Sequence, residues 1–172
     1  VFRQTTARLP WLLIGMLGGI GNSMILGNFD STFAAHPEMA LYIPLIGGTG
    51  GNVGTQSSAL VVQGLANSSL DSGNTLQQVL KESVVALINA TIISMLVYIY
   101  NFIRFGATAT VSYSVSISLF AVVMFASIFG TLVPMTLEKL KVDPAIATGP
   151  FISITNDIIG MMMYMGITVL LS

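Results

Sequence analysis

One carboxylate is notable because of the residues that surround it. Asp157 follows the segment TGPFISITN and precedes the apolar run IIGMMMYMGITVLL. If this stretch is a membrane-spanning helix, Asp157 lies roughly 13 Å along it, at about 1.5 Å per residue. An ionised carboxylate there costs about 2.5 kcal/mol or more unless it is compensated. We therefore expect Asp157 to be functional, beside a bundle interior or a water-filled path; the alternative is a protonated Asp hydrogen-bonded to another helix.

Residues three, four and seven positions from Asp157 share its helix face. They are small or polar over most of the stripe: Pro150, Ser153, Gly160 and Tyr164. The stripe predicts a narrow hydrated path along the helix. Near the helix start, the Gly149–Pro150 pair weakens the hydrogen-bond ladder, so we expect backbone carbonyls there to be free to face this path.

The charge pattern indicates which species such a path would carry. No Lys or Arg lies within a predicted helix core, so we expect a cation, and a monovalent ion, a proton or a divalent metal would each suit one carboxylate. In a homodimer, a two-fold axis would bring a second Asp157 toward the first, and a divalent cation would best relieve their repulsion. Mg²⁺ keeps several waters and needs few carboxylates, whereas Ca²⁺ recruits more oxygens, so the residues favour magnesium modestly.

A glycine-rich segment, GGTGGNVGTQSS at 47–58, carries the other unusual side chains. It is not a phosphate loop, because no Lys follows the glycines. Glycines spaced by four, such as Gly47 and Gly51, allow close helix packing, and packing alone is one reading of them. Asn52 and Gln56 share a face, and amides at this depth need partners, either on a facing helix or in pore water.

Several other chemistries are excluded by composition. The chain has no cysteine and a single histidine, His36, which we expect to be solvated in a loop, so thiolate sites, histidine clusters and hydrolase triads are absent and we expect no enzyme. The methionines near the C-terminus are read as core filler rather than a soft-metal site. With 6 basic and 7 acidic residues, nucleic-acid binding has no electrostatic basis.

The elements that position these residues are predicted to be membrane helices. The chain is 53% apolar and only 8% charged, against about 25% charged in soluble domains. A helix needs about 20 mostly apolar residues to span a bilayer, and strand alternation is lacking, so we predict an all-α integral membrane protein. Five runs are expected to be its helices: Leu9–Phe29, Glu38–Ala66, Gln78–Arg104, Val111–Leu137 and Thr148–Leu171.

The basic residues at the ends of these runs predict the orientation in the membrane. Short cytoplasmic loops are enriched in Lys and Arg. Five such residues fall on one side and only Arg104 on the other; the five are Arg3, Arg8, Lys81, Lys139 and Lys141. The N-terminus is therefore expected in the cytoplasm and the C-terminus outside.

Three segments together resemble the MgtE family of magnesium channels. They are PLIGGTGGNVGTQSSALVVQGLA at 44–66, LKE from Leu80, and VDPAIATGPFISITNDIIGMMMY at 142–164. The resemblance implies a homodimer of five-helix subunits in a lipid bilayer, which we expect to be a bacterial inner membrane. It also implies a central cation pore lined by the second and fifth helices of both chains.

The same resemblance implies roles for individual residues. Asp157 matches the acid that selects hydrated Mg²⁺, and Ser153 matches a position whose carbonyl lies close to that ion. Asp143 matches an acid at the cytoplasmic mouth that helps to bind a regulatory Mg²⁺. Gly149 departs from the family, which has Asn before the proline. We expect the remaining pore-lining residues to be Gly51, Asn52, Gly54, Gln56, Asn156 and Gly160.

The family usually carries cytosolic N-terminal and CBS domains, which are absent from these 172 residues. We therefore predict one transmembrane pore domain over 1–172, either excised from a longer protein or naturally short, with regulatory domains as partners outside the chain. Two rival functions remain. One is a proton- or sodium-coupled exporter of divalent ions, in which folding brings Glu82 near Asp157. The other is a non-conducting membrane dimerisation module.

Overall fold

The chain forms helices throughout the part that the structure describes. This computed structural model describes the backbone of residues 1–172 and every side chain except those of residues 72 and 147. Five helices are long: α1 (Phe2–Gly27), α3 (Ile43–Ala66), α4 (Thr75–Phe105), α5 (Thr110–Lys139) and α6 (Pro150–Leu171). Four short elements connect them: α2 (Asp30–Ala35) and the 3₁₀ turns η1 (Pro37–Tyr42), η2 (Ser72–Asn74) and η3 (Pro144–Ala147).

The all-helical prediction is confirmed, with four candidate membrane spans rather than five. The helices α1, α4, α5 and α6 are each long and apolar enough to cross a membrane. The fifth expected span, α3, has 24 residues but is rich in glycine and polar side chains. Because these residues lower its hydropathy, length and composition do not identify α3 as a span.

Proline and glycine explain where the observed boundaries differ from the expected ones. The first helix begins at Phe2 rather than Leu9 and contains Pro10, because one proline removes only one N–H from a ladder that continues on both sides. The second run is divided, since α3 begins at Ile43 with Pro44 in its first turn. Before α6, Gly149 has a φ of 102°, a conformation that favours glycine.

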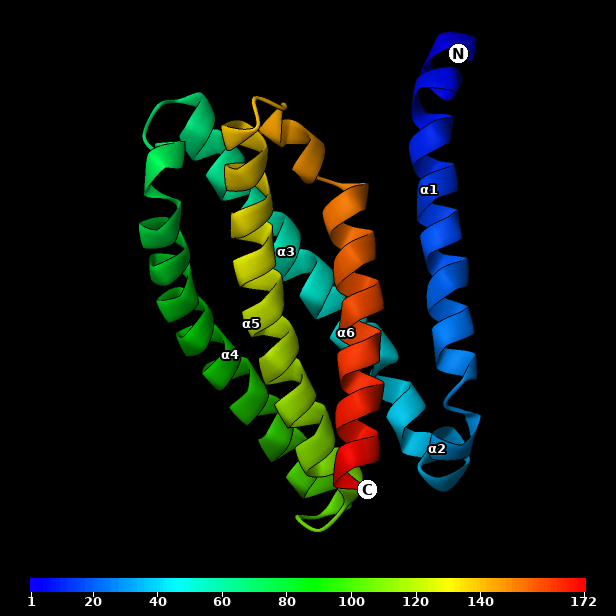
Figure 1. Cartoon of the computed structure of the whole chain (residues 1–172). Coiled ribbons are helices and arrows are strands. Elements are labelled where there is room, and N and C mark those ends of the chain that lie inside the picture. Colours follow the sequence, from blue (N-terminus) through cyan, green and yellow to red (C-terminus); the bar gives the residue numbers. More distant parts are fainter.

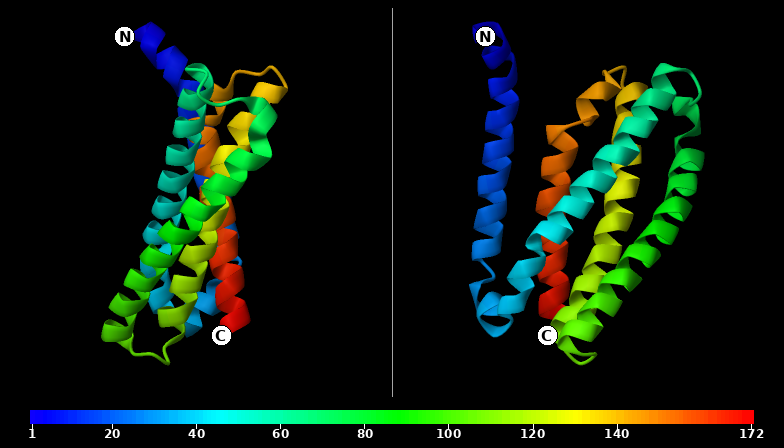
Figure 2. Two further views of the ribbon diagram at one scale, coloured as in Figure 1. Left: turned by 90° about the vertical axis from the view of Figure 1, so that its left-hand side faces the viewer. Right: turned by 180° about the vertical axis from the view of Figure 1, so that it is seen from behind.

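The core of the chain is built around α5. This helix packs against α3, α4 and α6 and has fifteen buried residues. Figures 1 and 2 show α3 crossing obliquely beside α5 and α6. The crossing is close, because a Cβ on Gly130 of α5 would lie only 2.5 Å from the carbonyl oxygen of Gly54 in α3. Glycine at this position lets the two backbones meet.

Helix α1 is attached to the rest of the subunit less extensively. It packs against α6 at one side of the bundle (Figure 1). It has no buried residue in its described length. Its half-buried residues recur every three or four positions and form one stripe, which includes Gly18 and Asn22. A Cβ on Gly18 would overlap the side chain of Ile154 in α6. The missing side chain therefore brings α1 against α6.

Candidate cation site

A polar cleft surrounds Asp157. Its volume is about 420 Å³, and it is lined by α1, α3 and α6. Asp157 itself is half-buried and is the only ionisable residue among the described lining residues. The full lining is Asn22, Ile43, Pro44, Gly47, Gly48, Gly51, Asn52, Thr55, Ser153, Asp157 and Met161. A hollow that holds one carboxyl group among hydroxyl and amide neighbours suits a cation.

The glycines of α3 place its backbone directly against this carboxylate. A Cβ on Gly51 would lie 3.5 Å from both Asp157 Oδ1 and Ser153 Oγ, and one on Gly47 would lie 3.6 Å from Asp157 Oδ1. The hydroxyl of Thr55 donates to the carbonyl oxygen of Gly51 at 2.7 Å. The side-chain space that these glycines leave open is therefore part of the cleft.

The structure brings together some of the predicted site residues but not others. Gly51, Asn52, Ser153 and Asp157 line the cleft. Gln56 is exposed on α3, one turn further along, and lies outside the described lining. If Gln56 lines a pore as predicted, that pore must therefore border the exposed surface of α3 beyond this cleft.

Three further residues that were predicted to line a pore are packed between helices: Gly54, Asn156 and Gly160. A Cβ on Gly54 would overlap the amide of Asn156, and one on Gly160 would lie 3.6 Å from Val122 of α5. Asn156 is 1% exposed, and neither its amide oxygen nor its amide nitrogen has a hydrogen-bond partner among the described groups. Neighbours on a helix point about 100° apart, so Asn156 turns inward while Asp157 faces the cleft.

The hydrated stripe predicted on α6 does not extend along the whole helix. Tyr164 is completely buried, and its hydroxyl donates to the carbonyl oxygen of Met39 at 2.7 Å. At the other end, the carbonyl of Gly149 is not free, because it accepts a hydrogen bond from Ser153 N at 3.1 Å. The polar face of α6 is open only around Ser153 and Asp157.

Sequence reasoning missed two polar residues of the cleft, Asn22 and Thr55. Asn22 lies about 135 positions from Asp157 in the chain, and its one signal was an amide within an apolar stretch of the first helix. Thr55 belongs to the glycine-rich segment, where its helical spacing of four from Gly51 places both on one face. Neither signal could indicate which other helix each residue would face.

Asp143 lies in a different hollow. Together with Glu138 and Ala145, it lines a space of about 330 Å³ beside the end of α3. The side chain of Asp143 accepts a hydrogen bond from Ala145 N at 3.0 Å and so caps η3. Among the described residues, no group of three or more acidic, histidine or cysteine side chains could hold a metal.

Glu82 forms a second polar cluster inside the bundle. Its Oε1 accepts hydrogen bonds from Ser57 of α3 and Ser127 of α5, both at 2.8 Å. The two serines are nearly buried, so this carboxylate of α4 connects three helices. Glu82 does not line the Asp157 cleft in the part that the structure describes.

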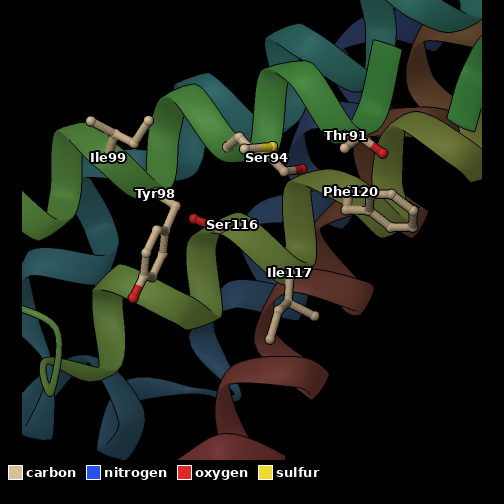
Figure 3. Close-up of a pocket in the computed structure, with 8 residues that line it drawn as sticks. Thr91, Ser94, Tyr98, Ile99, Ser116, Ile117 and Phe120 are labelled. Carbon is tan, nitrogen blue, oxygen red and sulfur yellow. The ribbon is translucent and has the colours of Figure 1, made fainter. Parts of the chain in front are cut away.

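The other polar and soft-metal candidates have simpler surroundings. His36 Nδ1 lies 3.6 Å from Glu38 Oε1 near the surface. Met161 and Met165 are completely buried, as filler residues would be, whereas Met162 is exposed. A groove of about 350 Å³ between α4 and α5 is mainly apolar, and its described lining has no Asp, Glu, Lys or Arg (Figure 3). Its lining is Thr91, Ser94, Met95, Tyr98, Ile99, Ser116, Ile117 and Phe120.

Comparison with known proteins relates this chain to a family of ion transporters. The model of the MgtE family, described as a divalent cation transporter, matches residues 43–167. Three relatives carry the name magnesium transporter MgtE. The one from Bacillus subtilis is 34% identical over 93% of this chain, that from Thermus thermophilus 34% over 96%, and that from Enterococcus faecalis 28% over 96%.

The matched region is only part of each relative. This chain spans 35% of the Bacillus subtilis protein and 36% of the other two. The family match and the four apolar helices support an integral membrane location. Since the family model covers most of the chain, the chain belongs to the MgtE family of divalent cation transporters.

Proposed function

We propose that residues 1–172 form a transmembrane pore domain that passes hydrated Mg²⁺ down its electrochemical gradient, with Asp157 as the selecting acid. The observation that carries this proposal is the cleft around Asp157, where one carboxylate lies among hydroxyls, amides and glycine backbone. No described Lys or Arg lines the cleft, so its field attracts cations. The relatives' name, magnesium transporter, supports Mg²⁺ as the substrate.

The donor set also favours magnesium among cations. The cleft offers hard oxygen atoms on Asp157, Ser153, Asn52 and Thr55, and a single carboxylate. Mg²⁺ binds through one or two carboxylates while it keeps several of its waters, so a sparse site suits it. A cleft of about 420 Å³ leaves room for such water around the ion.

The proposed assembly is a homodimer in a bacterial inner membrane, with the N-terminus in the cytoplasm. A two-fold axis beside the open side of the cleft would bring two Asp157 side chains to one ion. In this arrangement α3 crosses the membrane as well, since 24 residues make a helix about 36 Å long. Regulatory domains outside this chain belong to the same proposal, because the chain matches about a third of each relative.

A regulatory ion is proposed at the hollow near the end of α5. Asp143 and Glu138 line it together, so two carboxylates face one space. Like charges that share a site are relieved by a divalent cation. Occupancy of this site would rise with the cytoplasmic Mg²⁺ concentration, and the bound ion would act on η3 and the start of α6.

Substitution of Asp157 tests the transport proposal. Purified protein in liposomes, with a magnesium-sensitive dye inside, gives Mg²⁺ uptake for the parent, Asp157→Asn and the control Asp30→Asn. The control removes the same charge from an exposed site. We expect Asp157→Asn to reduce Mg²⁺ uptake at least about tenfold, or about 1.4 kcal/mol, while Asp30→Asn remains normal. Normal uptake and selectivity in a correctly inserted Asp157→Asn protein would overturn the proposal.

The same liposomes distinguish the rival functions. A proton- or sodium-coupled exporter would change its Mg²⁺ flux when a pH or sodium gradient is imposed, and a dimerisation module would show no flux at all. The exporter needs a second titratable group at the cleft, whereas Glu82 is bonded to Ser57 and Ser127 in a separate cluster. We therefore expect flux that follows the Mg²⁺ gradient alone.

A further inference from the structure

An amide in α1 has an unmet hydrogen-bonding capacity at the edge of the cleft. Asn22 lies in the apolar stretch LLIGMLGGIGNSMIL, where an amide is unusual, and it lines the same hollow as Asp157. Its Oδ1 is buried and accepts no hydrogen bond from any described group. A buried oxygen without a donor is costly, so a donor from another source would stabilise this arrangement.

The packing of α1 on α6 explains why this amide lies at the level of Asp157. Gly18 contacts Ile154 closely, and the two helices run in the same direction (Figure 1). Asn22 is one turn after Gly18, and Asp157 is three residues after Ile154, so both steps advance by about one turn. The contact at Gly18 thus places Asn22 opposite the carboxylate.

We infer that Asn22 is a cation-binding residue of the Asp157 cleft, whose amide oxygen accepts a hydrogen bond from water that hydrates the ion. The inference rests on the proposed function and adds a residue from a third helix to its site. A hydrated divalent cation polarises its waters and makes them strong donors, which is what a free amide oxygen requires. Asp157 supplies the charge, and Asn22 holds the hydration shell from the side of α1.

Cysteine labelling tests the position of Asn22 independently of transport. The natural chain has no cysteine, so each introduced thiol reacts without background. Asn22→Cys is compared with Ser23→Cys, the neighbour on the exposed side of α1, in the 172-residue protein in liposomes. We expect a water-soluble thiol reagent to label Asn22→Cys and not Ser23→Cys, and Mg²⁺ to slow the labelling. Combination with Asp157→Asn should abolish this protection.

Flux measurements test the contribution of Asn22 to binding. We expect Asn22→Ala to raise the half-saturating Mg²⁺ concentration by about two- to tenfold, the range for one lost hydrogen bond, with little change in maximal flux. Gly18→Ala should have the same effect, because it displaces α1 from Ile154. Gly19→Ala is the matched control, since a Cβ there meets no atom within 4 Å.

The outcomes separate this inference from the transport proposal. Equal labelling of the two cysteine variants, or labelling that Mg²⁺ does not slow, would overturn the role of Asn22 while the loss of flux in Asp157→Asn still stands. An unchanged half-saturating concentration in a well-folded Asn22→Ala protein would overturn it as well. If Asp157→Asn instead transports normally, the transport proposal itself fails.

Discussion

At the residue scale, the cleft depends on glycines that serve two different purposes. Gly47 and Gly51 face Asp157 at ordinary contact distances, so their missing side chains leave open space beside the carboxylate. Gly54 and Gly130 lie where two backbones cross, and a Cβ there would meet an amide or a carbonyl too closely. The first pair shapes the cleft, and the second pair permits the fold.

This distinction predicts different outcomes for substitutions at Gly51 and Gly130. Gly51→Ala adds one methyl at 3.5 Å from Asp157 and should insert and transport nearly normally, whereas Gly51→Leu should fill the cleft and abolish Mg²⁺ flux in a folded protein. Gly130→Ala should reduce the yield and thermal stability of the protein, because the clash is with backbone. Liposome flux and thermal unfolding in detergent measure these effects. Normal flux in Gly51→Leu would contradict the position of the ion beside α3.

At the element scale, the connection between α5 and α6 combines a cap with a candidate ion site. Asp143 caps η3 through Ala145 N and also faces Glu138 across a hollow. An N-cap carboxylate contributes about 0.5–2 kcal/mol without any metal, so capping is a sufficient reason for an acid here. A regulatory role needs an effect that capping does not explain.

We predict that Asp143 transmits inhibition by cytoplasmic Mg²⁺. Asp143→Asn keeps an acceptor for the cap but removes the charge, so it should weaken inhibition while leaving maximal flux through the Asp157 cleft intact. Glu138→Gln should act in the same direction, because both side chains line one space. Flux recorded against internal Mg²⁺ measures the effect. Inhibition curves identical to that of the parent for both variants would leave only the capping role.

The Glu82 cluster shows how polar groups connect elements inside the bundle. Ser57, Glu82 and Ser127 belong to three helices and lie within hydrogen-bond distance of one another. Each interhelical bond of this kind contributes about 0.6 kcal/mol on average in a membrane protein. The cluster therefore helps to position α3, whose opposite face borders the Asp157 cleft.

At the scale of the whole molecule, α3 retains polar side chains that the subunit does not cover. Asn52 and Gln56 are both exposed, although they lie on a helix inside the bundle. Amides in a membrane require partners, so if α3 crosses the membrane as proposed, this face would need a second subunit or pore water. A two-fold dimer would bring the same face of α3 from each chain to the axis.

We predict that this face crosslinks to itself. In the cysteine-free chain, Gln56→Cys should form a disulfide-linked dimer in membranes under mild oxidation, since a two-fold axis beside α3 brings equivalent positions together. Leu96→Cys, exposed on α4, is the control and should stay monomeric. Denaturing electrophoresis without reductant measures the dimer. If only Leu96→Cys crosslinks, the dimer axis lies beside α4 and the predicted axis beside α3 is wrong.

Much of this architecture could be predicted because it depends on local properties of the chain. Apolar length identified four of the helices with boundaries that mostly agree within a few residues, and the position of Asp157 in an apolar run drew attention to the carboxylate that lines the polar cleft. The spacing of the glycines in α3 also predicted close helix packing. Helices α3 and α5 do pack closely where Gly54 meets Gly130. Each of these signals needs only one helix and its immediate neighbours.

Tertiary structure decided which faces of the helices meet. Asn156 and Tyr164 carry polar groups on the same helix as Asp157, yet both lie in the packed interior, at 1% and 0% exposure. Asn22 joins the cleft because Gly18 docks α1 on α6. The sequence by itself determined which segments form helices and placed one carboxyl group, that of Asp157, within an apolar run. The rotation of each helix about its axis, and thus the membership of the cleft, follows from contacts between residues far apart in the chain, which no local pattern encodes.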